Sequence, residues 1–106
     1  MSEVQNLRSP KVQVRGLCHL GRLIDKIQLR HAGKIQDYNY LTVGFDKYLL
    51  DLLEIKGEEL EKRVLQGGKE EELVDWVMNN GKSLTEEGRA QWNSMVLNGV
   101  PKNEQA

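Results

Sequence analysis

The apolar residues between Leu17 and His31 recur at the spacing of an α-helix, and this segment constrains the fold more than any other. At about 100° per residue, one side of the helix carries Leu17, Leu20, Leu23, Ile24, Ile27 and His31. Such a stripe predicts a helix with one buried face. Ala32 and Gly33 supply its end, because glycine adopts positive φ without a Cβ penalty. Gly21 lowers helix propensity, so regular helix is expected to begin only near it.

Four further segments show helical spacing of apolar residues. They run from Phe45 to Leu53, from Gly57 to Gly67, from Glu70 to Gly81 and from Ser83 to Gly99. Glycines punctuate their ends, and Ser83 with Glu86 matches the spacing of a capping box at the start of the last one. We therefore predict an all-α fold, a compact bundle of about five short helices.

Two segments do not have a helical period. Residues Lys11–Arg15 alternate polar and apolar side chains, but the run is too short to form a sheet without a partner, so we interpret it as an extended lead-in. Residues 34–44 carry β-branched and aromatic side chains with little alternation. We predict an ordered aromatic loop there, directly after the first helix, and a single short strand is the alternative.

With 106 residues, the chain is long enough for one domain and too short for two. We expect one domain over residues 1–106, with an ordered core over about 8–100 and mobile tails at 1–7 and 101–106, because Pro10 and Pro101 bracket the patterned region. The 39% of hydrophobic and 29% of charged residues are typical of a soluble globular protein. No run suits a membrane span or a secretory signal, so we expect a cytoplasmic protein.

The net charge of −1 conceals a division along the chain. Residues 1–34 carry seven Lys or Arg against two acids, whereas residues 35–106 carry eight against fourteen. On the first predicted helix, Lys26 and Arg30 share a stripe with Arg15 and His19 if the helix reaches back that far, and Arg22 lies at its shoulder. This stripe is either the solvated face of an amphipathic helix or a surface that binds phosphate or carboxylate groups.

The candidate site consists of polar and aromatic residues that a helical bundle does not need for its core. These residues are Arg22, Asp25, Lys26, Tyr38, Tyr40, Asp46, Trp92 and Asn93. Arginine and lysine recognise anions, and two tyrosines spaced two apart in a loop often line a pocket. The ordinary alternatives are that the tyrosines cover the core, that Asp46 caps a helix and that Trp92 is a core residue.

Asp25 and Lys26 are neighbours on the first predicted helix and point about 100° apart. They cannot pair with one another on one face, so each needs a partner from elsewhere. For Asp25 we expect that partner in Tyr38, Tyr40 or the last helix.

Several classes of site have no support in the sequence. His19 and His31 lie about 120° apart on the predicted helix, and with Cys18 they make no metal-binding cluster, so we predict no metal. We expect no cofactor either, since no nucleotide-binding or nucleophile motif occurs. Cys18 and His19 are consecutive and diverge on a helix, which disfavours a catalytic thiol. The near-neutral charge argues against nucleic acid as a partner, and we expect no membrane partner.

Several short runs together resemble domain-of-unknown-function family 5069, whose members are small bacterial proteins without an assigned activity. The runs are Arg8-Ser9-Pro10, Gly16-Leu17, Leu20 to Lys26, Gly33, Tyr38-Asn39-Tyr40, Asp46, Trp76-Val77 and Trp92-Asn93. The run Arg22-Leu23-Ile24-Asp25-Lys26 is the most specific of them. The chain departs from the family pattern at Gly21, where proline is usual, and at Thr42-Val43-Gly44. The resemblance implies a small helical cytoplasmic protein and carries no reaction, cofactor or catalytic residue.

Three functional hypotheses follow from these residues. The first is a small binding module with an anion-accepting pocket between the first helix, the Tyr38–Tyr40 loop and the last helix. The second is a module that binds a protein partner or forms a homodimer through an apolar face at Leu49–Leu53. The third is a small enzyme that uses the same cleft, with Asp25 or Asp46 as general base and a tyrosine or lysine as acid.

Overall fold

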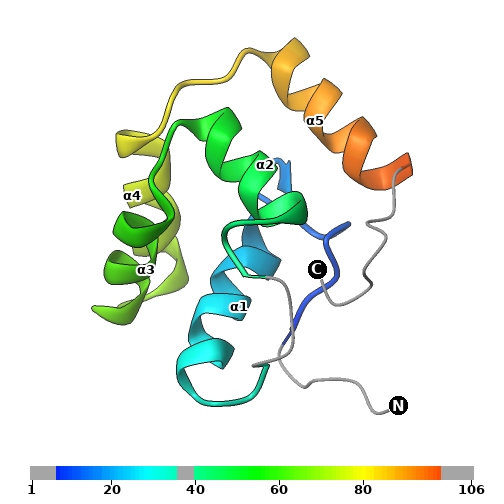
Figure 1. The fold of residues 1–106 in the computed structure, drawn as a ribbon. Coiled ribbons are helices and arrows are strands. Elements are labelled where there is room, and N and C mark those ends of the chain that lie inside the picture. The colour runs from blue at the N-terminus through cyan, green and yellow to red at the C-terminus, as the bar shows by residue number, and fades with distance from the viewer. Residues whose placement is uncertain (1–6, 36–39, 99–106) are drawn as a thin grey trace.

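The structure is a computed structural model that describes residues 7–35 and 40–98. Within these ranges a small β-hairpin precedes five α-helices (Figure 1). The elements are β1 (Gln13–Val14), β2 (Leu17–Cys18), α1 (Leu20–His31), α2 (Gly44–Leu53), α3 (Gly57–Leu65), α4 (Glu70–Asn80) and α5 (Glu86–Asn98). The prediction of a mostly helical globule with five short helices is confirmed. Residues 36–39 of the predicted aromatic loop lie outside the described residues, while residues 34–35 and 40–43 have neither helix nor strand and Gly44 already begins α2.

The hairpin corrects the sequence-based interpretation of residues 11–18. Val14 pairs with Leu17 and Gln13 with Cys18 in an antiparallel register. Arg15 and Gly16 form the loop with φ of 53° and 80°, the positive values of a type I′ turn, which follows the right-handed twist of paired strands. The strand-like alternation therefore has a partner three residues further on. Helix α1 begins at Leu20, close to the start expected near Gly21.

Helix α1 lies at the centre of the described structure. Helix α3 packs against it, α4 packs against α3, and α5 packs on β2 (Figure 1). The core collects the apolar face of α1 and the inward residues of the other helices, including Leu23, Ile24, Ile27, Leu49, Leu53, Leu60, Leu73, Val77, Trp92 and Val96. The apolar stripe predicted for the first helix is confirmed for Leu20, Leu23, Ile24 and Ile27. Leu17 is buried but belongs to β2, and His31 at the end of the helix is exposed.

Two local predictions are wrong. Thr85, not Ser83, caps α5, because its Oγ1 accepts a hydrogen bond of 2.9 Å from the backbone N–H of Gly88. The apolar face at Leu49–Leu53 is not left over for a partner, since Leu49, Leu50 and Leu53 are buried in the core of the chain itself.

Among the described residues, no helix combines the length and the apolar character that crossing a membrane requires.

Candidate functional site

The first half of α1 buries polar side chains where a solvated basic stripe was one expectation. Arg22, Asp25 and Lys26 are buried, together with His19 just before the helix and Asp46 in the first turn of α2. His19 and Lys26 have no exposed surface at all. The solvated-face alternative is therefore wrong for Arg22 and Lys26. Arg15 lies in the hairpin loop and does not belong to a helical stripe.

Asp46 is the centre of this buried group. Its Oδ1 lies 2.6 Å from Nε2 of His19, and its Oδ2 lies 2.8 Å from Nζ of Lys26. Oδ2 also accepts a hydrogen bond of 3.0 Å from the backbone N–H of Leu41. The carboxylate therefore binds α1 on one side and the segment leading into α2 on the other. This arrangement replaces the helix-capping role considered for Asp46, because α2 has no side-chain cap bond.

The protonation states in this buried group follow from its contacts. Burial lowers the pKa of His19, and the charges of Lys26 and Arg22 lower it further against the opposing effect of Asp46. Burial by itself raises the pKa of Asp46, but the hydrogen bond from His19 and the charge of Lys26 outweigh it and leave that pKa below its usual value. Asp46 is thus a carboxylate and accepts from the Nε2–H of a neutral His19 imidazole.

Among the residues that the structure describes, two buried polar atoms in the group have no hydrogen-bond partner, Nδ1 of His19 and Nζ of Lys26. The ammonium of Lys26 lies at ion-pair distance from Asp46, but without the alignment of a hydrogen bond. Burial lowers the pKa of Lys26, and Asp46 opposes that effect. Since an unmet buried donor or acceptor costs about 1–3 kcal/mol, the arrangement is expensive for a purely structural contact.

Backbone strain coincides with the same carboxylate. Four residues other than glycine have positive φ within the described ranges: Arg15, His19, Leu41 and Glu54. Two of them, His19 at 71° and Leu41 at 60°, contact Asp46 directly. Non-glycine residues in this region carry of order 1–3 kcal/mol of strain, and such residues gather at functional sites. The contacts of Asp46 hold both conformations in place.

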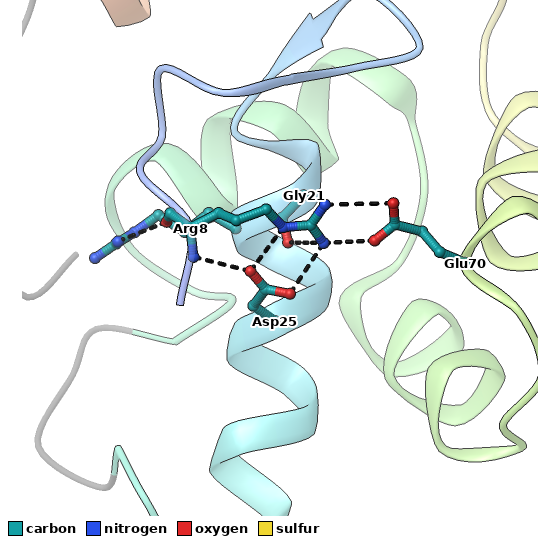
Figure 2. Close-up of polar contacts among 5 residues, drawn as sticks. Arg8, Gly21, Asp25 and Glu70 are labelled. Carbon is teal, nitrogen blue, oxygen red and sulfur yellow. Dashed lines mark hydrogen bonds and ion pairs between the residues drawn. The ribbon is translucent and has the colours of Figure 1, made fainter. Parts of the chain in front are cut away.

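Asp25 lies in a second ionic cluster, which the N-terminal segment completes. Arg8 donates from Nε and Nη2 to the two oxygens of Asp25 at 2.9 Å each, and its backbone N–H donates to the same carboxylate (Figure 2). The guanidinium also reaches Glu70 at the start of α4 and the carbonyl of Gly21. Asp25 and Lys26 thus each have an outside partner, as predicted, but the partner of Asp25 is Arg8 and neither Tyr40 nor the last helix.

The two clusters are joined through Arg22. Its Nη1 donates to the backbone carbonyl of Arg8 at 3.0 Å, while its charge lowers the pKa of both His19 and Lys26. Gly21 gives Arg8 the room to cross α1, because a Cβ at this position would lie 2.9 Å from Cζ of Arg8 and 2.8 Å from Cγ2 of Val14. Glycine at position 21 therefore has a local packing reason in this chain.

Trp92 and Asn93 support the group without joining it. Nε1 of Trp92 donates to the carbonyl of Cys18 at 2.9 Å, and Asn93 both accepts from the N–H of Cys18 and donates to the carbonyl of Gly16. Trp92 is also buried against the edge of Phe45, whose ring in turn meets His19. The core alternative for Trp92 is confirmed, and both residues hold the hairpin that precedes His19.

Tyr40 points to a different cluster. Its hydroxyl donates to Oε2 of Glu61 at 2.6 Å, and the guanidinium of Arg30 lies over its ring. Nε2 of His31 reaches the same Glu61 oxygen at 2.9 Å. Burial and the hydrogen bond to Glu61 raise the pKa of Tyr40 well above its usual value. Tyr38 lies outside the described residues.

Sequence reasoning missed two participants, His19 and Arg8. His19 was considered on a helical stripe, as a metal ligand and beside Cys18, but not as a partner of Asp46, because its positive φ and its Asp46 partner depend on tertiary structure. Arg8 was noted in the family resemblance alone. A signal for both was available in the unpaired Asp25 and Lys26, which demanded outside partners. Within residues 7–35 and 40–98, no three His, Cys, Asp or Glu side chains are grouped as metal ligands.

Comparison with protein families gives one match. The family model described as Domain of unknown function (DUF5069) matches residues 4–106, which is nearly the whole chain. A search of curated proteins finds no match. The family resemblance drawn from the sequence is thereby confirmed.

Proposed function

We propose, from the premise that the chain belongs to the family described as Domain of unknown function (DUF5069), that it is a small cytoplasmic binding module for an anionic ligand. The ligand binds at the Asp46 cluster, which we define as His19, Lys26 and Asp46, between α1 and the start of α2. The sequence-based hypothesis is kept in its ligand class and changed in its residues, since Tyr40 and Asn93 have other partners.

The observation that carries the proposal is the state of Lys26. Its ammonium is completely buried, faces a single carboxylate at 2.8 Å and makes no aligned hydrogen bond. An ammonium has three N–H donors, so a further acceptor oxygen beside Asp46 would satisfy donors that Asp46 alone leaves without an acceptor. Carboxylate and phosphate oxygens are the acceptors that form the strongest hydrogen bonds with such a donor.

Charge supports an anion over a neutral ligand. Lys26 and Arg22 both act electrostatically on His19, and Asp46 is the carboxylate that opposes them there. An added negative charge lowers the energy of two buried cations, whereas a neutral ligand would leave their mutual repulsion unchanged. Replacing a buried ion pair by apolar side chains of similar volume often costs little stability, so a binding role is a reason for its presence.

The Asp46 cluster is closed to solvent, so the ligand enters by a local opening. Leu41 is the natural place for it, because its strained backbone is held by one hydrogen bond to Asp46. A ligand that competes for Lys26 weakens the ion pair between Lys26 and Asp46. Asp46 can then release the backbone N–H of Leu41, which relieves the backbone strain at that residue. Opening and binding are then coupled through a single carboxylate.

Isothermal titration of the full chain with inorganic phosphate and with acetate tests the proposal, with Lys26→Met as the variant. Wild type should bind at least one of the two anions, and Lys26→Met should lose that binding by about 100-fold, the loss of a buried charge-assisted hydrogen bond. Lys47→Met is the matched control, because Lys47 is an exposed lysine paired with Asp51 on α2. Equal binding by wild type and Lys26→Met would overturn the proposal.

A folded variant without the cluster is available if Lys26→Met alone unfolds. In the double variant Lys26→Met/Asp46→Leu no charge is left without its partner, so this chain should fold. It should bind neither anion. Binding by this variant would equally contradict the assignment of the site.

A second candidate function, proton transfer in a small enzyme, is favoured by the pairing of His19 with Asp46. A carboxylate that accepts from one imidazole nitrogen orients the ring and leaves the other nitrogen as a base. In this reading His19 is the general base and Asp46 its positioning residue. The test incubates the full chain with a carboxylate in D2O. Proton NMR then shows whether a carbon-bound hydrogen of that carboxylate is exchanged for deuterium. No exchange above the level of His19→Gln would remove this candidate.

A further inference from the structure

We propose that the Asp46 cluster selects oxyanions that carry a hydroxyl hydrogen, such as hydrogen phosphate or a hydroxycarboxylate, over acceptor-only oxyanions such as sulfate. The inference rests on the proposed function and adds the chemical class of its ligand. It is carried by the two partnerless buried atoms taken together, Nδ1 of His19 and Nζ of Lys26.

The two atoms have opposite hydrogen-bonding character. Asp46 Oδ1 lies 2.6 Å from Nε2 of His19, and a carboxylate only accepts, so the ring proton is on Nε2. Nδ1 is then a lone pair and accepts. Lys26 Nζ carries only N–H groups and donates. The unmet capacity of the cluster is therefore one acceptor, Nδ1 of His19, and one donor, Nζ of Lys26. The contacts with Asp46 are made by Nε2 of His19 and by Nζ of Lys26.

A ligand that satisfies both atoms must accept and donate. Hydrogen phosphate does so, because one oxygen carries a proton while the others accept. A carboxylate with a hydroxyl on the neighbouring carbon has the same pair of groups. Sulfate has the shape of phosphate but no proton at neutral pH, so one of its lone pairs would face the lone pair of Nδ1. Buried polar groups that lose their hydrogen-bond partner discriminate strongly against the analogue that lacks it.

Among the described residues, the surroundings of His19 supply no partner for Nδ1. The imidazole is wholly buried, Phe45 lies at its edge with ring centroids 5.7 Å apart, and no hydrogen-bond partner reaches Nδ1. Cys18 is adjacent in the chain, but its Sγ contacts the carbonyl of Lys11 at 3.8 Å. A hydroxyl group of the ligand is thus the partner that this atom lacks.

The experiment compares two matched pairs of anions on the full chain by isothermal titration at pH 7.5 and constant ionic strength. The pairs are inorganic phosphate with sulfate, and lactate with propionate. In each pair only the first member carries a hydroxyl hydrogen. We expect the hydroxyl-bearing member of at least one pair to bind at least about ten-fold more tightly. Which pair shows the preference distinguishes phosphate from hydroxycarboxylate as the ligand class.

His19→Gln is the variant that isolates Nδ1. Glutamine still offers an N–H to Asp46 from its terminal amide but has no acceptor at the δ position, so the preference should fall to near unity while binding of the anion persists. Where this variant does not fold, nitrogen-15 NMR of wild type gives the answer, since the His19 Nδ1 resonance should shift with the hydroxyl-bearing anion and not with its analogue.

The outcomes separate the two proposals. Equal affinities within both pairs, a preference that survives in His19→Gln, or an Nδ1 resonance that responds equally to both anions would overturn the inference and leave the binding module standing. No binding of any of the four anions would overturn both.

Discussion

Two ionic clusters lie on neighbouring faces of the same half of α1, and they differ in how completely their hydrogen bonds are met. The cluster around Asp25 is partly exposed, and Arg8 contributes both its guanidinium and its backbone N–H to that carboxylate. The Asp46 cluster is fully buried, and two of its polar atoms have no partner. The first cluster, Arg8 with Asp25 and Glu70, has the properties of a structural contact, and we call it the clamp. The Asp46 cluster has the properties of an incomplete site.

The largest expected effect comes from removing the centre of the Asp46 cluster. Asp46→Ala leaves Lys26 buried without its anion and removes the acceptor of His19 and Leu41, so the free energy of unfolding should fall by about 3–5 kcal/mol. Urea unfolding followed by circular dichroism measures it. The double variant Lys26→Met/Asp46→Leu should lose much less. If the double variant is the less stable of the two, the ion pair is a structural necessity and the contrast between the clusters fails.

The next prediction tests the close approach of Arg8 to Gly21 on α1. Gly21→Ala raises helix propensity but places a Cβ within 3 Å of Val14 and Arg8, so it should destabilise the protein by about 1–3 kcal/mol. In an Arg8→Ala background the penalty should shrink and not vanish, because the Val14 contact remains. A double-mutant cycle by chemical unfolding gives the coupling. Full additivity would show that Arg8 does not cross α1 at Gly21 in solution.

Arg8→Ala should cost about 1–2 kcal/mol, less than a buried pair, because its side chain is 31% exposed and water replaces part of the contact. Arg8→Lys keeps the charge but not the two-pronged contact with Asp25, and it should recover only part of the loss. Thermal unfolding of both variants checks this order. A loss as large as that of Asp46→Ala would remove the distinction between clamp and site.

Acidification should lower the stability of the fold through protonation of His19. The pKa of His19 is lowered by burial, so the unfolded chain takes up a proton on this group at about its ordinary value of 6.5 while the folded chain does not. Stability from this group is therefore present above that value and is lost as the pH falls below it, down to the lowered folded pKa. His19→Gln should flatten this part of the pH profile of unfolding. If the pH profile of His19→Gln equals that of wild type, a group other than His19 causes the loss of stability.

The smallest change in stability is expected for Glu70, the most exposed residue of the clamp. Glu70 is about half exposed and meets only the outer side of Arg8, so Glu70→Ala should change stability by less than about 1 kcal/mol. High salt should remove most of the difference between Glu70→Ala and wild type. A larger or salt-insensitive loss in thermal unfolding would contradict this minor role of Glu70 in the clamp.

Periodicity predicted the helices, because burial of an apolar face is a local pattern with a fixed spacing. The same geometry predicted that Asp25 and Lys26 need separate partners, which holds in the structure. The identities of those partners were not predictable, since Arg8 and Asp46 reach α1 from segments placed by tertiary packing. His19 was assigned to a helical stripe, because positive φ is uncommon at residues other than glycine, even though histidine adopts it more often than most.

The ties between α5 and the hairpin set the order in which the Asp46 cluster can form. Trp92 donates to the carbonyl of Cys18 across 74 residues, and Asn93 holds both Cys18 and Gly16. His19 follows Cys18 directly, so we expect its conformation to be fixed only after the loop between Cys18 and Trp92, which lie 74 residues apart, has closed. A chain truncated before α5 should therefore contain every residue of the cluster and still not assemble it.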